Sequence, residues 1–248
     1  MTTQEIARTL DHAVLRPDAT LGELEAACRM AAREGIATVC VRPSDLPVAR
    51  ALLAGSATRP GTVIGFPHGT TSAAAKVAEA RQAVLDGAAE LDMVLNIGRL
   101  KSGDLVHVED DIAAVLAEAR RLGVLLKVIF ENTLLSDAEK LAACAICSRL
   151  RVDFVKTSTG FAGGGATLED LVLMRTHSDP SVSVKASGGI RDLDSVLAAL
   201  AVGADRIGTS STEAILAESR KREAAGTLAP MAREDALART AQGKGKTY

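Results

Sequence analysis

The chain has 248 residues, of which 47% are hydrophobic and only 2% aromatic, and its formal net charge is −2. This length suits one large domain or two average ones. Lys and Arg are spread along the chain without a basic block, which argues against nucleic acid binding. The sequence MTTQEIARTL is unlike a signal peptide, and no apolar run reaches the roughly 18 to 20 residues that span a bilayer. We therefore expect a soluble, cytoplasmic protein that binds no membrane.

Short apolar runs alternate with longer amphipathic stretches along the chain. The runs that we predict as strands begin in turn with LDHAV at residue 10, ATVCV at 37, TVIGF at 62, ELDMVLN at 90, LLKVIFE at 125, DFVKTS at 153, SVKAS at 183 and DRIGTS at 205. The stretches between them have helical periodicity, and several end on glycine. Strands that alternate with helices indicate parallel pairing and right-handed crossovers.

Two of the predicted helices are clear in the sequence, at residues 21–35 and 71–87. In the second helix we place Lys76 mostly outside the buried face. The residues that we expect to form its apolar stripe are Ala74, Val77, Ala78, Val84 and Leu85.

Eight strand–helix units in about 250 residues favour one closed (β/α)8 barrel, a TIM barrel, as the single domain of residues 1–248. The alternative is an open doubly wound sheet, which usually carries a glycine fingerprint after its first strand. The segment LDHAVLRPDAT has no such fingerprint. Residues 222–240 are predicted to form a last helix outside the repeat, so that 222–248 comprise a carboxyl-terminal helix and a mobile tail ending in Tyr248.

Polar residues interrupt the apolar strands, and a barrel carries its chemistry where strands end and the following loops begin. Lys127, Lys156 and Lys185 come from three successive strands, so we expect their amines to converge in the barrel mouth. Asp92 is an acid with apolar neighbours on both sides. The full set of such polar positions is Asp11, Cys40, Asp92, Asn96, Lys127, Glu131, Lys156 and Lys185.

Convergent lysines predict amine chemistry. Crowded ammonium groups and burial both disfavour the charged form, so at least one amine is expected to have a lowered pKa. A neutral lysine amine forms a Schiff base with a carbonyl substrate, and this chemistry needs no metal. Asp92 would keep a neighbouring ammonium charged and position a water for proton transfer. The alternative is an inert layer of paired lysines and acids.

Glycine-containing turns follow the last two predicted strands, as ASGGIRD at 186–192 and IGTSS at 207–211. Glycines let backbone N–H groups approach a phosphate, and helix N-termini favour an anion. Arg191 would add positive charge there, and Ser210 and Ser211 would donate hydrogen bonds. Two ordinary turns that cap helices are the alternative interpretation.

The cysteines do not predict a metal or redox site. Cys144 and Cys147 form a C-x-x-C pattern inside a predicted helix, but no second pair or histidine pair completes a zinc site. Buried helix thiols are the preferred interpretation, and we expect no disulfides.

Several segments, in order, resemble the class I deoxyribose-phosphate aldolases. They are LDHAVLRPDAT, VCVRPSDL, VIGFPHGTT, ELDMVLNIGRLKSGD, LKVIFENTLL, DFVKTSTGFAGGGAT and VKASGGIRD. The match covers nearly the whole chain, and KTSTGF followed by KASGGIR at this separation is highly specific. The resemblance implies a (β/α)8 barrel that reversibly cleaves 2-deoxy-D-ribose 5-phosphate to D-glyceraldehyde 3-phosphate and acetaldehyde. It also implies that no cofactor or metal is needed, and that the enzyme is a homodimer.

The resemblance assigns roles to individual residues. It implies that Lys156 is the Schiff-base lysine, that Lys185 lowers the pKa of Lys156, and that Asp92 relays protons. Tyr248 is similar to a mobile terminal tyrosine that assists proton transfer at the enamine carbon. The candidate substrate- and phosphate-binding residues are Asp11, Cys40, Lys127, Thr157, Gly188, Gly189, Arg191, Gly208, Ser210 and Ser211. The positions that depart from the usual family residues are Ala13, Arg16, Arg42 and His68.

Other functions are compatible with parts of this pattern. A Schiff-base aldolase with another carbonyl donor would keep the same lysines. A catalytically silent barrel that senses a sugar phosphate would keep the phosphate turns. A phosphate-binding isomerase fits less well, because it needs no convergent amines.

Overall fold

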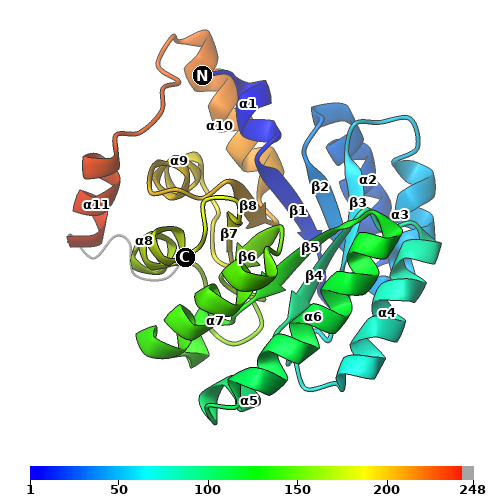
Figure 1. Ribbon diagram of the computed structural model, residues 1–248. Helices are drawn as coiled ribbons and strands as arrows, with labels where there is room; N and C mark the ends of the chain where they lie inside the picture. The colour runs from blue at the N-terminus through cyan, green and yellow to red at the C-terminus, as the bar shows by residue number, and fades with distance from the viewer. Residues whose placement is uncertain (242–248) are drawn as a thin grey trace.

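The structure is a computed structural model, and it describes residues 1–241. Eight parallel strands close into a barrel in chain order, from β1 to β8, and helices surround it (Figure 1). Pairing of β1 with β8, through Leu10 and Ile207, completes the ring. The predicted (β/α)8 barrel is confirmed.

The predicted strands are all present, with small differences at their ends. They are β1 (Leu10–Val14), β2 (Thr38–Val41), β3 (Arg59–Ile64), β4 (Glu90–Val94), β5 (Leu125–Ile129), β6 (Phe154–Lys156), β7 (Ser183–Ser187) and β8 (Arg206–Thr209). The α-helices are α1 (Thr3–Ala7), α2 (Leu21–Glu34), α3 (Leu46–Leu52), α4 (Ala73–Asp86), α5 (Ile97–Lys101), α6 (Leu105–Leu122), α7 (Asp137–Leu150), α8 (Leu168–His177), α9 (Leu193–Ala201), α10 (Thr212–Ala224) and α11 (Arg233–Ala241). Short 3-10 turns cover Pro43–Asp45 and Asn132–Leu134. None of the helices in the described part of the chain is long and apolar enough to cross a membrane.

Local sequence sets the ends of the helices. The Thr20 hydroxyl accepts from the backbone N–H of Glu23, and the Glu23 carboxylate accepts from the N–H of Thr20, which forms a capping box at the start of α2. The same helix ends at Gly35, whose φ of 63° lies in the left-handed region that glycine tolerates.

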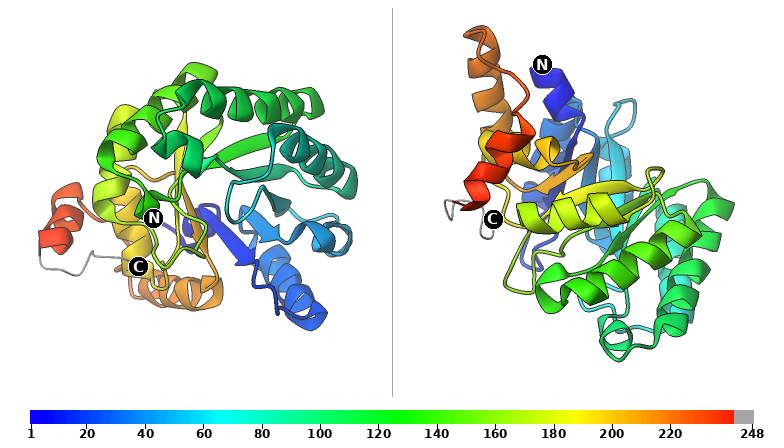
Figure 2. Two further views of the ribbon diagram at one scale, coloured as in Figure 1. Left: turned by 90° about the horizontal axis from the view of Figure 1, so that it is seen from below. Right: turned by 60° about the vertical axis from the view of Figure 1, so that its left-hand side comes forward.

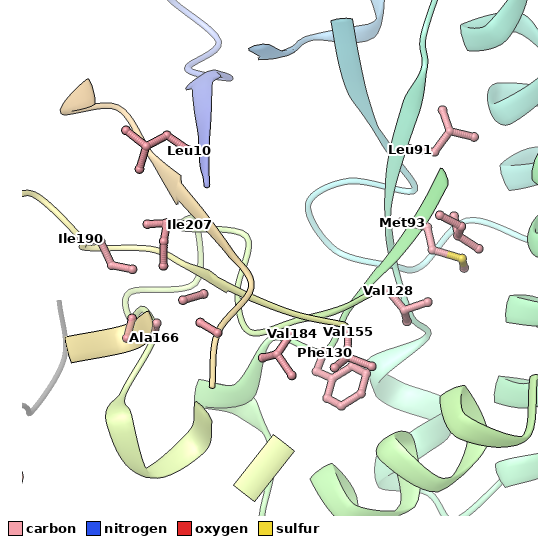
Figure 3. Packing of buried hydrophobic residues seen from close by; sticks show 14 of the residues in the cluster. Leu10, Leu91, Met93, Val128, Phe130, Val155, Ala166, Val184, Ile190 and Ile207 are labelled. Carbon is pink, nitrogen blue, oxygen red and sulfur yellow. The ribbon is translucent and has the colours of Figure 1, made fainter. Parts of the chain in front are cut away.

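Alternation along the strands separates two environments. In β4, for example, Leu91 and Met93 pack in the hydrophobic core, whereas Asp92 between them reaches the barrel interior. Figure 3 shows apolar side chains of β4 and β5 on the side of the strands where the helices pack. Successive strand residues point to opposite faces, so the alternate residues meet inside the barrel.

The buried face of α4 differs from the predicted stripe, which was wrong in part. Leu85 is 66% exposed, and Ala74 and Ala78 are also exposed. The buried residues are instead Lys76, Ala80 and Ala83. Lys76 is buried because its Nζ donates to the Val94 carbonyl at 2.9 Å and pairs with Asp111 Oδ2 at 2.6 Å.

The segment predicted as one last helix, residues 222–240, is divided between two helices. α10 ends at Ala224 and α11 begins at Arg233, with Gly226 at a φ of 68° between them. α11 packs beside α8 and α9 (Figure 2), where Ala236 is buried. The predicted tail with Tyr248 lies outside the described residues.

Candidate active site

Three lysines meet on one carboxylate inside the barrel. Asp92 Oδ1 accepts from Lys127 Nζ at 2.8 Å, and Asp92 Oδ2 accepts from Lys156 Nζ and Lys185 Nζ, each at 2.8 Å. Strand register produces this meeting, because Asp92 is paired with Lys127 across β4 and β5, and Lys156 with Lys185 across β6 and β7. The predicted convergence of the three amines is therefore present.

Further charged side chains surround this cluster. Asp11 Oδ2 lies 2.5 Å from Lys185 Nζ, and Asp11 Oδ1 lies 2.7 Å from a guanidinium nitrogen of Arg206. Glu90 pairs with Lys127 at 2.6 Å and with Arg206 at 3.4 Å. We call the seven residues Asp11, Glu90, Asp92, Lys127, Lys156, Lys185 and Arg206 the charge layer.

The charge layer has one more base than acid. Its four basic residues carry +4 when protonated, and its three acids carry −3, so one positive charge is left over. Release of one proton makes the layer neutral. Because the three lysines and the three acids are buried, the excess charge favours loss of a proton from the least compensated amine.

Lys156 is that amine. Burial lowers its pKa, the positive charge of Lys185 lowers it further, and the pairing with Asp92 offsets this only in part. Burial also opposes the charges of Lys185 and Lys127, but nearby carboxylates outweigh it and raise the pKa of both. Asp92 is buried too, yet the three lysines hold its pKa well below the usual range.

A cavity of about 300 Å³ opens above the charge layer at the carboxyl ends of the strands. Lys156 and Lys185 lie on its wall. The other predicted site residues that line it are Asp11, Cys40, Gly188, Gly189, Arg191, Gly208 and Ser210. One cavity is thus lined both by the predicted reactive amine, Lys156, and by the two predicted phosphate turns.

Some predicted site residues do not line this cavity. Asp92 and Lys127 are 1% exposed and take part in the charge layer. Thr157 joins β6 to β7, because its hydroxyl donates to the Ser187 carbonyl and accepts from the Ser187 N–H, both at 3.0 Å. Ser211 lies at the start of α10, beside the lining residue Ser210.

The two glycine turns have little space for side chains. Gly188 and Gly189 have φ values of 91° and 78°, which glycine adopts far more easily than other residues. A Cβ on Gly188 would lie 2.8 Å from the Cα of Gly165, and a Cβ on Gly208 would meet the Ser187 hydroxyl. These turns therefore let backbone form the wall of the cavity.

Sequence reasoning missed several residues around the site. Glu90 and Arg206 belong to the charge layer, and each lies two positions from a residue on the same strand face, Asp92 or Gly208. That spacing was the available signal. Thr159 and Phe161 line the cavity from the loop after β6, where no regular period exists to reveal them.

The cysteines are buried thiols, as predicted. Cys144 and Cys147 lie on α7 and are fully buried, and burial raises the pKa of both. Cys40 reaches the cavity, but burial and then Asp92 raise the pKa of its thiol to about 11. None of these thiols is activated as a nucleophile.

The known proteins that resemble this chain include several deoxyribose-phosphate aldolases. A deoxyribose-phosphate aldolase of Bacillus licheniformis is 49% identical over 86% of this chain and 96% of its own, and one of Rhodopirellula baltica is 45% identical over 88% and 90%. The tetrameric deoxyribose phosphate aldolase of Aeropyrum pernix superposes with a TM-score of 0.80 at 31% identity, over 89% of this chain and 92% of that one. Residues 6–218 match the sequence model of the DeoC/LacD family of aldolases. The chain belongs to this aldolase family.

Proposed function

We propose that this chain is a Schiff-base aldolase that reversibly cleaves 2-deoxy-D-ribose 5-phosphate into D-glyceraldehyde 3-phosphate and acetaldehyde. The names of the Bacillus licheniformis and Rhodopirellula baltica relatives support the substrate. The assignment of Lys156 as the nucleophile rests on one observation: its amine has a lowered pKa and also lies on the cavity wall.

The first stage forms a covalent intermediate. The neutral Nζ of Lys156 adds to the C1 aldehyde of the open-chain sugar phosphate, loss of water gives an imine, and uptake of a proton gives the iminium. The positive iminium nitrogen accepts the electron pair that the C2–C3 bond releases. Lys185 stays protonated in this stage because its pKa is raised, and it keeps positive charge beside Lys156.

The second stage moves protons and releases products. We assign to Asp92 and Lys185 a water that accepts the proton of the C3 hydroxyl while the C2–C3 bond breaks. D-Glyceraldehyde 3-phosphate then leaves, and the enamine is protonated at C2, a step that we assign to Tyr248. Water hydrolyses the resulting iminium, which frees acetaldehyde and restores the amine of Lys156.

The phosphate end of the substrate is proposed to bind at the two glycine turns. Gly188, Gly189 and Gly208 would present backbone to the phosphate, and Arg191 and Ser210 lie on the same wall. α9 and α10 begin just after these turns, so their N-termini favour an anion there. Binding of the unreactive end would orient C1 toward Lys156 and lower the entropic part of the barrier.

Borohydride trapping tests the proposal. Reduction of the protein with acetaldehyde should leave one ethyl group on the peptide that contains Lys156, and Lys156→Met should abolish both the adduct and turnover. An adduct on Lys127 or Lys185 would refute the assigned roles. Tight binding of the sugar phosphate by the unaltered chain without any adduct would indicate a silent sensor instead of an aldolase.

Two expectations remain predictions. We propose a homodimer, as the family resemblance implies, although the Aeropyrum pernix relative is described as tetrameric. The cytoplasmic location also stays a prediction.

A further inference from the structure

One partly buried histidine, His12, has no role in the mechanism proposed above. It lies in β1 next to Asp11 of the charge layer, and its side chain points to the opposite face of the strand, toward the helices. Its Nδ1 forms a 2.9 Å hydrogen bond with the hydroxyl of Thr212, which is fully buried at the first position of α10. This bond joins residues that are 200 positions apart in sequence.

The hydrogen bond lies directly beside the turn after β8. Ser210 and Ser211 stand between β8 and Thr212, and Ser210 lines the cavity above the charge layer, here called the catalytic cavity. In the pairing of β1 with β8, His12 is level with Thr209, the last residue of β8. Holding the side chain of Thr212 therefore fixes the end of this turn relative to β1.

A second set of hydrogen bonds fixes the beginning of the same turn. The Thr209 hydroxyl donates to the Ile190 carbonyl at 2.6 Å and accepts from the Ser211 N–H at 2.9 Å. Ile190 belongs to the turn after β7 and also lines the catalytic cavity. The two phosphate turns are thus linked to each other through Thr209 and to β1 through His12.

Packing supports the turn after β8 on only part of its surface. Beside the catalytic cavity lies another cavity of about 240 Å³, and His12 lines only this smaller one. The residues that line both cavities are Ala13, Leu15, Arg16 and Ser210. Because Ser210 has open space on two sides, the turn has room to shift if the bond between His12 and Thr212 is lost.

We propose that His12 is a positioning residue for the phosphate end of the substrate, which acts by holding the turn after β8 through Thr212. This inference rests on the proposed aldolase function and deepens it, because neither residue lines the catalytic cavity. In the described part of the chain, Ser211 makes no side-chain cap hydrogen bond at the start of α10. The N–H groups of the first turn of α10 can therefore donate to an anion, provided that the turn keeps its place.

His12 performs this task without a charge. Burial lowers its pKa to about 4, so the ring is neutral at neutral pH, with one ring nitrogen as donor and the other as acceptor. A neutral ring does not itself attract phosphate. Its effect on phosphate affinity is therefore exerted through the turn alone.

Steady-state kinetics with 2-deoxy-D-ribose 5-phosphate and with unphosphorylated 2-deoxyribose test the proposal. His12→Leu and Thr212→Val remove the hydrogen bond from either side, and each should raise KM for the phosphorylated sugar about fivefold, the loss expected for one hydrogen bond. The kcat for this sugar and the KM for 2-deoxyribose should barely change. His12→Asn keeps a hydrogen-bonding atom at about the position of Nδ1, so it should restore most of the affinity.

A double variant and a matched control sharpen the test. His12→Leu combined with Thr212→Val should raise KM no more than either single change, because both remove the same bond. Ser219→Ala is the control, since Ser219 is also fully buried on α10 and donates to the Thr3 hydroxyl at 3.1 Å, away from the turn. It should leave KM for both sugars unchanged.

Three results would overturn the proposal: equal rises in KM for both sugars, additive effects in the double variant, or a rise in Ser219→Ala as large as in Thr212→Val. Borohydride trapping of acetaldehyde on Lys156 involves no phosphate. A normal adduct in His12→Leu therefore separates weakened phosphate binding from lost aldolase chemistry. Absence of the adduct in the unaltered chain would refute the proposed aldolase function instead.

Discussion

At the scale of single residues, neighbouring charges distinguish the three lysines of the charge layer. Lys127, Lys156 and Lys185 all contact Asp92 and are all buried. Lys185 also has Asp11 at 2.5 Å, and Lys127 also has Glu90 at 2.6 Å, whereas Lys156 pairs with Asp92 alone among the described acids. The amine with the fewest anionic partners is therefore the one that most easily loses its proton.

Lys185→Met should raise the pKa of Lys156, because it removes a positive neighbour and frees Asp92 from one of its partners. The acidic limb of the pH profile of kcat/KM should move to higher pH. Each unit of that shift lowers the neutral fraction of Lys156 at neutral pH about tenfold. Activity and borohydride-trapped adduct, both measured against pH, check this result.

Lys140→Met is the matched control, since Lys140 is also buried and pairs with Asp170, but on the helices α7 and α8. It should cost stability without moving the acidic limb. An unchanged limb in Lys185→Met would show that Lys185 does not tune Lys156.

At the scale of elements, the strand period accounts for what could be predicted from sequence. Lys127, Lys156 and Lys185 stood out because each interrupts an apolar run, and eight such runs favoured a barrel. Glu90 and Arg206 stand at the first positions of β4 and β8, where polar residues are common and carry little signal. The two-residue spacing to Asp92 and Gly208 places them on the inward face of their strands, but the pairing of Glu90 with Arg206 joins strands distant in sequence, which no local pattern predicts.

Helix faces were harder to predict than strands. The predicted buried face of α4 was wrong in part because Lys76 pairs with Asp111 on another helix, and this pairing allows the charged Lys76 to be buried. The prediction of one helix over residues 222–240 was wrong because Gly226 and the residues after it interrupt the helical periodicity. Both errors come from tertiary or backbone effects that hydrophobic periodicity does not describe.

The turn between β7 and α9 gives a prediction about phosphate. Gly188→Ala should raise KM for 2-deoxy-D-ribose 5-phosphate about tenfold or more, because a φ of 91° and the nearby Gly165 Cα force the turn to move. For unphosphorylated 2-deoxyribose, KM should change much less. Steady-state kinetics with both sugars provide the measurement.

Gly226→Ala is the control for strain alone. Gly226 has a similar positive φ of 68° and lies after α10, where a Cβ on this residue would meet open space. The substitution should lower stability without changing KM for either sugar. Equal effects of Gly188→Ala on both sugars would argue against a phosphate role for the turn.

At the scale of the whole molecule, the charge layer links β1 with β4 through β8 across the barrel interior. Such a buried network makes stability depend on pH through the pKa difference between folded and unfolded chains. Asp11 and Asp92 have lowered pKa values, and Lys127 and Lys185 have raised ones. The two pairs therefore act at opposite ends of the pH scale.

The stability contributed by Asp11 and Asp92 should be present above their ordinary pKa of 3.8 and disappear as pH falls through the lower folded values. That of Lys127 and Lys185 should be present below 10.5 and disappear as pH rises through the raised values. Through these four groups the urea midpoint should fall toward both pH extremes. In Asp92→Asn the midpoint should drop by the equivalent of about 3–5 kcal/mol at neutral pH, with a weaker acid dependence. An acid dependence in Asp92→Asn as steep as in the unaltered chain would contradict this.

In the proposed mechanism, the excess positive charge of the charge layer acts at two stages of a turnover. It first favours loss of the proton from the resting amine of Lys156. Once the imine has formed and is protonated, the same electrostatic repulsion acts on the substrate-bearing nitrogen. Cleavage of the C2–C3 bond converts the iminium into an uncharged enamine. The electron pair of that bond therefore also removes the repulsion between this nitrogen and the charge layer. The same excess of positive charge thereby favours the neutral, nucleophilic amine of Lys156 and later makes the iminium on that nitrogen a stronger electrophile.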